Sequence, residues 1–268
     1  ANHLKSFGLG NFMGYDLPTG RKGHIPTSKF YDRFYPNGGW RSTTIISNSI
    51  GQGEVSMTPI QLANMMATIA NRGYYYTPHI IKQIKGRKID TKYTTKHVTT
   101  IDRKYFDPIV NGLFDVYNHG TAYGLGVPGL EICGKTGTAE NFAKINGKRV
   151  QLEDHSEFVA FAPRIQPKIA IAVIVENGHY GNTWAGPIAT LMIEKYLNKK
   201  ITRKDLEKRM LEGNLNWQYR KLYPAKDSIN KPKLTKVDSL RMKLKSKKEI
   251  EEEKKKKQAA KKKDSVKK

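Results

Sequence analysis

The sequence predicts an α+β fold in which helices pack on an antiparallel sheet, followed by a basic tail. Three apolar segments of strand length lie in the second half of the chain: Gly129–Thr138, Glu157–Pro163 and Lys168–Glu176. The connections between them contain no helix-length amphipathic run, which favours sequential antiparallel pairing over parallel crossovers. In the third segment both alternating sets of side chains are apolar, so this strand is expected to be covered on both faces.

Helices are predicted on either side of these segments. A capping box at Thr58-Pro59-Ile60-Gln61 begins the first helix, which is expected to stop near Arg72-Gly73. A third helix, from about Trp184 to Asn198, is expected to pack its apolar face on the sheet. The second helix occupies about Asp102–Asn118 and carries one apolar stripe, formed by Phe106, Ile109, Leu113 and Val116/Tyr117.

The two ends of the chain differ in composition. Residues 1–56 are rich in glycine, aromatic residues and turn signals, which predicts ordered loops packed by aromatic side chains. The net charge of +24 is concentrated after residue 198, where 26 Lys and Arg accompany 10 Asp and Glu. No aromatic residue follows Ala225, so this segment cannot bury enough apolar surface to offset its chain entropy. We expect a domain over 1–198, a helical or extended connector over 199–224 and a disordered Lys-rich tail over 225–268.

Cysteine and histidine usage argue against a metal or disulfide framework. The single cysteine, Cys133, excludes an internal disulfide and a cysteine-based zinc cluster. The histidines considered as ligands show no metal-ligand spacing, and we expect neither a metal nor a cofactor: His24, His79, His97, His119, His155 and His179. No stretch reaches the roughly 18 apolar residues of a membrane span.

The string Gly134-Lys135-Thr136-Gly137-Thr138 is the most informative motif for chemistry. It ends the first predicted strand, and its lysine ammonium and threonine hydroxyl are suited to binding a carboxylate. Gly137 lets another backbone approach closely. The residues alone are equally compatible with an ordinary strand-to-turn transition, so the tripeptide does not decide the function.

Further sequence strings make the interpretation of this motif more specific. Lys-Thr-Gly is one of three motifs of penicillin-binding proteins and class A β-lactamases. The chain resembles class B, elongation-type penicillin-binding proteins (penicillin-binding protein 2) in strings that follow the family's order between residues 4 and 198: Phe7-Gly8-Leu9-Gly10, Gly14-Tyr15-Asp16-Leu17-Pro18, Ile45 to Gly53, Thr58 to Ala63, Gly120-Thr121-Ala122 and His155 to Pro163.

The resemblance implies the penicillin-binding protein/serine β-lactamase-like fold and a serine D,D-transpeptidase that cross-links peptidoglycan stem peptides and is acylated by β-lactam antibiotics. Lys135 and Thr136 would bind the terminal carboxylate, Gly137 would complete the motif, and Thr138 would supply an oxyanion-hole N–H. The resemblance also implies a bacterial inner-membrane protein with a periplasmic-facing domain and a membrane glycosyltransferase partner in the elongation machinery. Nucleic acid is not an expected partner.

The sequence also departs from the family pattern. The nucleophilic Ser-x-x-Lys and the Ser-x-Asn motifs belong before Phe7-Gly8-Leu9-Gly10, and this chain begins at Ala1. Ser228-Ile-Asn-Lys231 and Ser265-Val-Lys-Lys268 match Ser-x-x-Lys formally, but nothing in their basic surroundings would bury the lysine. We therefore expect residues 1–198 to be the C-terminal part of an incomplete transpeptidase domain, inactive alone.

Two alternatives stay open from the sequence. A D,D-carboxypeptidase or β-lactamase of the same fold would hydrolyse the acyl-enzyme instead of transferring it. A non-catalytic binding protein would use the basic tail to contact anionic polymers through counterion release.

Overall fold

The computed structural model describes residues 1–17, 19–145 and 147–218 of the 268. The chain divides into two compact units, residues 1–215 and 216–268, and only 216–218 of the second are described.

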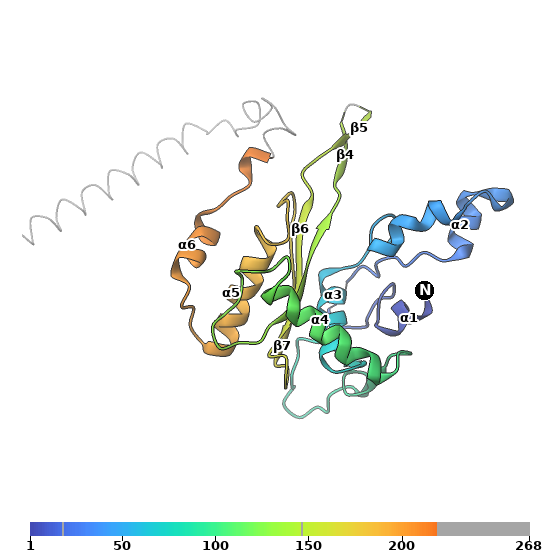
Figure 1. Ribbon diagram of the computed structural model, residues 1–268. Helices are drawn as coiled ribbons and strands as arrows, with labels where there is room; N and C mark the ends of the chain where they lie inside the picture. The colour runs from blue at the N-terminus through green and yellow to red at the C-terminus, as the bar shows by residue number, and fades with distance from the viewer. Residues whose placement is uncertain (18, 146, 219–268) are drawn as a thin grey trace, which may run out of the picture. The chain divides into compact units, whose positions relative to one another are not determined.

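Figure 1 shows the course of the first unit. Its helices are α1 (Asn2–Ser6), α2 (Ser28–Phe34), α3 (Pro59–Ala70), α4 (Phe106–Asn118), α5 (Ala185–Asn198) and α6 (Lys204–Glu212), with 3-10 turns η1 (Pro36–Gly38), η2 (Ser42–Ile50), η3 (Thr91–Tyr93) and η4 (Arg103–Tyr105). Its strands are β1 (Tyr74–Tyr76), β2 (Lys96–Val98), β3 (Cys133–Ala139), β4 (Phe142–Ile145), β5 (Lys148–Gln151), β6 (His155–Ala162) and β7 (Ile169–Val175).

The central sheet has the order β3-β6-β7, with both pairs antiparallel. This confirms the predicted pairing of the three apolar segments. The first strand begins at Cys133 and not at Gly129, because Gly129 adopts a left-handed φ of 77° and Val127 and Leu130 close a tight turn. In the resulting register, Lys135 lies opposite Val159 and Gly137 lies opposite Glu157.

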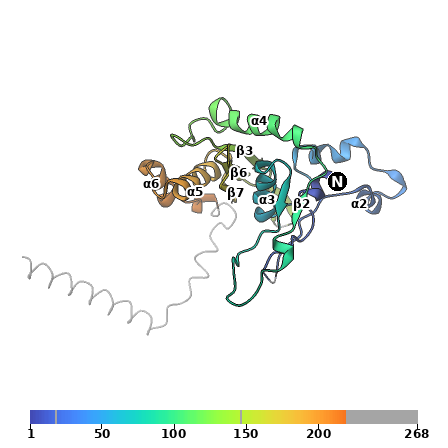
Figure 2. The ribbon, with the colours of Figure 1, turned by 90° about the horizontal axis from the view of Figure 1, so that it is seen from below.

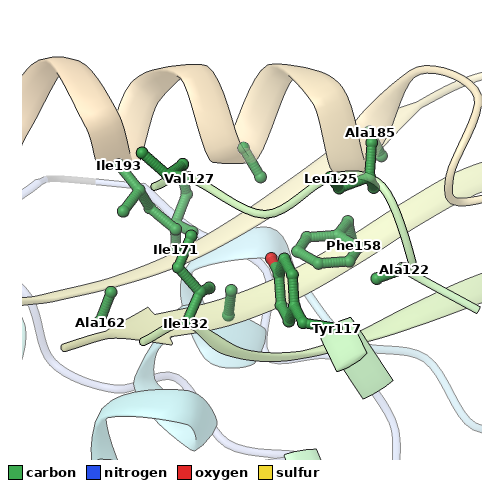
Figure 3. Packing of buried hydrophobic residues seen from close by; sticks show 12 residues of the cluster. Tyr117, Ala122, Leu125, Val127, Ile132, Phe158, Ala162, Ile171, Ala185 and Ile193 are labelled. Atoms are coloured by element: carbon green, nitrogen blue, oxygen red, sulfur yellow. The ribbon is translucent and has the colours of Figure 1, made fainter. Parts of the chain in front are cut away.

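One face of the sheet packs against α5. Phe158 and Ile171 point from β6 and β7 toward the helix, where Ile193 and Ala185 meet them (Figure 3). The Phe158 ring lies edge-on to Tyr117 at a centroid distance of 6.0 Å. Fully burying a side chain of this size contributes roughly 1.5–3 kcal/mol, so this cluster fixes α5 on the sheet.

The opposite face of the sheet is covered by α3 and α4. Met66 and Ala70 of α3 and Val110 of α4 form a second buried cluster with Cys133 and Phe161. Figure 2 shows the sheet between α5 on one side and α3 on the other. The alternation of side chains along β6 therefore supplies two cores, with Phe158 in one and Phe161 in the other.

The first predicted helix begins as its capping box requires. Thr58 Oγ1 accepts from the Gln61 N–H, and Gln61 Oε1 accepts from the Thr58 N–H at 3.0 Å. The same Gln61 side chain is buried, and its amide donates to the carbonyls of Asn11 and Lys22 at 3.0 and 2.9 Å. This one residue thus starts α3 and ties the N-terminal segment to it.

Three sequence expectations differ from the structure. Residues 1–56 contain α1, α2 and two 3-10 turns and are not loops throughout, although aromatic pairs such as Tyr31 and Trp40 do pack them. The β4–β5 hairpin was not predicted, because its short strands carry little apolar alternation. In α4, Val110 is buried and Ile109 is 53% exposed, because the helix begins at Phe106, after η4, and turns Val110 toward the sheet.

The predicted connector contains α6, but residues 219–268, which include the whole predicted tail, lie outside the described part of the chain. The boundaries at 198 and 224 stay predictions. Among the described residues, no helix has both the length and the apolar character that a membrane span requires.

Candidate carboxylate-binding strand

β3 forms an edge of the central sheet and carries the predicted site residues. Its only sheet partner among the described residues is β6, so its other edge is unpaired. Lys135 and Thr138 are exposed, while Thr136 and Gly137 are half-buried. Because residues alternate along a strand, Lys135 and Gly137 lie on the α3 face and Thr136 and Thr138 on the α5 face. All four predicted residues therefore lie at one open strand edge.

The Lys135 ammonium lies against the backbone of its own strand. Its Nζ donates to the Thr136 carbonyl oxygen at 2.8 Å and lies 3.4 Å from Thr136 Oγ1. No carboxylate in the described residues forms an ion pair with it. An ammonium held only by a neutral carbonyl and a hydroxyl can exchange these contacts for a stronger charge-assisted bond to an incoming carboxylate.

The Thr136 hydroxyl is positioned from outside the strand. Its Oγ1 lies 2.6 Å from Oγ1 of Thr121, which belongs to the turn after α4. Either oxygen can be the donor, so the pair leaves one hydroxyl hydrogen free to bond a further acceptor. Sequence reasoning placed Gly120-Thr121-Ala122 among the family strings but gave it no contact with the motif; the structure supplies that contact.

A second backbone segment packs against the motif. A side chain at Gly181 would meet the carbonyl oxygens of Gly137 at 2.8 Å and Glu157 at a closer distance, and Thr136 Cβ at 3.0 Å. Only glycine fits there. This approach was not predicted for Gly181. The segment before α5 therefore lies close against β3 at Thr136 and Gly137.

Glu157 lies next to the motif on the α3 face. Its carboxylate covers Gly137, where a Cβ would meet Glu157 Oε2 at 2.9 Å. Burial raises the pKa of this carboxyl, and the nearby His155 lowers it to a smaller degree. On the same face, a groove of about 870 Å³ borders Ile174, which pairs with Glu157, and also contacts Met57 and Pro59. The groove borders β7 and does not include the motif residues of β3.

The described residues carry the β3 motif but contain no Ser-x-x-Lys sequence. Burial raises the pKa of the Cys133 thiol to about 12, so the thiolate is not populated at neutral pH. Ser228 and Ser265 lie outside the described residues. No group of three His, Cys, Asp or Glu residues in the described part of the chain is arranged to hold a metal ion. What β3 offers is an exposed ammonium, a neighbouring hydroxyl and a strand edge that is unpaired among the described residues.

A family model named "Penicillin binding protein transpeptidase domain" matches residues 1–194. The chain belongs to the penicillin-binding protein transpeptidase family. The matched range includes the Lys135-Thr136-Gly137 string on β3.

The family includes relatives with established names. The chain is 35% identical over 213 residues to the peptidoglycan D,D-transpeptidase MrdA of Acinetobacter baumannii, covering 75% of this chain and 31% of that protein. The MrdA of Escherichia coli K12 is 31% identical over 204 residues, with 70% and 31% covered. The chain therefore spans about a third of the length of the curated relatives it matches.

Solved structures show the same fold. The Pseudomonas aeruginosa PBP2 in complex with WCK 5153 has a TM-score of 0.60 and 28% identity, covering 75% of this chain and 43% of that one. A chain of a peptidoglycan synthase complex that coordinates polymerization and crosslinking has a TM-score of 0.61 and 28% identity, with 74% and 32% covered. The penicillin-binding protein fold is thus present, and incomplete relative to these chains.

Proposed function

We propose that this chain is the C-terminal part of a serine D,D-transpeptidase that cross-links peptidoglycan stem peptides during cell elongation. The observation that carries the proposal is the Lys135 ammonium beside the Thr136 hydroxyl on the free edge of β3, in a chain of the transpeptidase family. The names of the MrdA relatives supply the reaction.

The strand explains how a peptide would be held. Lys135 and Thr136 bind the terminal carboxylate, and the free N–H and C=O groups of β3 pair with the extended peptide by strand addition. The Thr138 N–H then lies two residues farther along the strand, where it donates to the carbonyl oxygen as that oxygen becomes an oxyanion.

The chemical step requires a serine that the described residues do not supply. We place it in a segment that precedes Ala1 in the complete protein. Its hydroxyl oxygen attacks the penultimate carbonyl carbon, a base takes the hydroxyl proton, and the terminal D-alanine leaves with a proton on its amine. The acceptor amine then attacks the acyl-enzyme ester and releases the serine.

The similarity to the MrdA relatives also supports a proposal about the cellular setting. We propose an inner-membrane protein with this domain facing the periplasm and its anchor outside this chain. We also propose a membrane glycosyltransferase as partner. The similarity to a chain of a synthase complex that couples polymerization to crosslinking supports this partner.

Labelling with a fluorescent penicillin tests the proposal. The 268-residue chain is expected to form no covalent adduct, whereas the complete gene product is expected to label at one serine upstream of Ala1. Product analysis then separates the activities, because a carboxypeptidase or β-lactamase releases the acyl group to water and a transpeptidase transfers it to an amine. Failure of the complete protein to label would contradict the proposal and favour a non-catalytic binding protein.

A further inference from the structure

The β4–β5 hairpin is a cationic ribbon that continues the binding strand. β4 follows β3 after two residues, and β5 precedes β6 in a similar way, so the hairpin extends beyond the end of the sheet (Figure 1). The side of β4 that does not face β5 therefore continues the edge of β3 that does not face β6. A peptide paired along β3 past Ala139 would reach this hairpin.

One face of the hairpin carries two positively charged side chains. Lys144 lies directly opposite Arg149, and both side chains are exposed. Like charges directly opposite on a sheet are unfavourable. Among the described residues no carboxylate forms an ion pair with either one, and residues 141–152 contain no Asp or Glu. The nearest acidic residues in the sequence are Glu140 and Glu153 at the base of the hairpin, so neither positive charge is ion-paired within the described residues.

An aromatic ring orients the guanidinium. The Arg149 guanidinium carbon lies 3.8 Å from the centroid of the Phe142 ring, and Phe142 shares a strand face with Lys144 because the two are two residues apart on β4. Stacking fixes the plane of the guanidinium while leaving its N–H groups free. The planar Arg149 guanidinium beside the Lys144 ammonium suits a carboxylate, because the two carboxylate oxygens can accept from two guanidinium N–H groups at once.

We propose that the face of the hairpin formed by Phe142, Lys144 and Arg149 binds a carboxylate on the upstream part of the donor peptide, whose terminal carboxylate binds at Lys135. The inference rests on the proposed function, because it requires the peptide to lie along β3 with its N-terminal part toward Ala139. It assigns selection of acidic donor peptides to a segment that carries none of the family's motifs.

Two donor peptides and one double variant test this inference in the complete gene product. One donor carries upstream side-chain carboxylates, and the other has the same sequence with those carboxylates amidated. For Lys144→Gln/Arg149→Gln, we expect the KM for the acidic donor to rise by about three- to tenfold, since exposed ion pairs are modest, with an unchanged KM for the amidated donor. Lys85→Gln/Lys88→Gln, on the exposed loop between β1 and β2, is the matched charge control and should leave both values unchanged.

Other outcomes overturn the inference. An unchanged KM for the acidic donor, or equal changes for both donors, would show that the hairpin does not recognise the carboxylate. Loss of binding to anionic lipid vesicles with an unchanged donor KM would assign the hairpin to a membrane surface. Penicillin is too small to reach the hairpin from Lys135, so its acylation of the protein tests the proposed function separately. If the unsubstituted protein is acylated and the donors are not distinguished, the hairpin inference alone fails; without acylation, both fail.

Discussion

The hydroxyl oxygens of Thr121 and Thr136 lie 2.6 Å apart and join the turn after α4 to β3. The same turn is held from its other end, because Arg203 Nη1 donates to the Leu125 carbonyl oxygen at 3.0 Å. Arg203 in turn pairs with Glu194 of α5 at 3.0 Å. The side chain of Thr136 is therefore positioned by residues from three parts of the chain.

Thr121→Val removes the hydroxyl partner of Thr136. We expect penicillin acylation of the complete protein to slow by a few-fold, since a neutral hydrogen bond contributes about 1 kcal/mol. Thr121→Ser keeps the hydroxyl and should restore the rate. A valine variant that is acylated as fast as the unsubstituted protein would show that the contact does not position Thr136.

Breaking the Glu194–Arg203 pair should destabilise the domain. The Glu194 side chain is fully buried and also accepts from the Thr202 N–H at 2.8 Å. Arg203→Ala leaves this carboxylate without its charged partner, and we expect a loss of about 3 kcal/mol in unfolding free energy, measured by urea denaturation. The double variant Glu194→Leu/Arg203→Met should recover much of that loss. Equal stability of Arg203→Ala and the unsubstituted chain would show that the buried carboxylate does not depend on this partner.

Glu157 should make stability fall as pH rises. Burial raises the pKa of its carboxyl above the ordinary 4.5 of the unfolded chain, so the folded state binds the proton more tightly. The resulting stabilisation is present below pH 4.5 and is lost as pH rises through the folded-state pKa. Glu157→Gln removes the charge, and we expect a higher Tm at about pH 7 and a smaller loss of stability between about pH 4 and 7, measured by thermal unfolding. A lower Tm at neutral pH would indicate that the carboxylate makes a favourable contact.

Two glycine substitutions should have opposite effects. Gly181→Ala places a methyl group against the carbonyl oxygens of Gly137 and Glu157, so we expect it to cost about 1–3 kcal/mol. Gly112→Ala, in α4, meets no atom within 4 Å and should stabilise the chain by about 0.5–1 kcal/mol. Comparing the two urea midpoints checks the close packing over β3. If Gly181→Ala is as stable as the unsubstituted chain, that packing is looser than described.

The sequence was sufficient for those parts of the fold that have local signals. The capping box at Thr58 and Gln61 determines where α3 begins, and the double apolar alternation of residues 169–175 identifies a strand that helices cover on both faces. Both signals arise within a few neighbouring residues. The start of β3 was less predictable, because the turn at Gly129 depends on a backbone conformation that glycine permits but does not require.

The contacts around the site could not be predicted from local pattern. Thr121 and Thr136 are separated by 15 residues, and Gly181 reaches β3 from beyond β7. Such contacts depend on how the layers pack and not on periodicity or capping. That Lys135 to Thr138 share one strand was predictable, since they are consecutive in an apolar segment of strand length; their role in binding stays a prediction.

The rate of penicillin acylation of Lys135→Ala, measured in the complete gene product beside Thr136→Val, tests the central claim most directly. If Lys135 binds the carboxylate, its loss removes a charge-assisted bond, and acylation should slow by about tenfold or more, whereas Thr136→Val should slow it less. Lys85→Gln, on the exposed loop between β1 and β2, serves as the control for the loss of one positive charge. Acylation of Lys135→Ala at the unsubstituted rate would contradict the assignment of β3 as the carboxylate-binding strand.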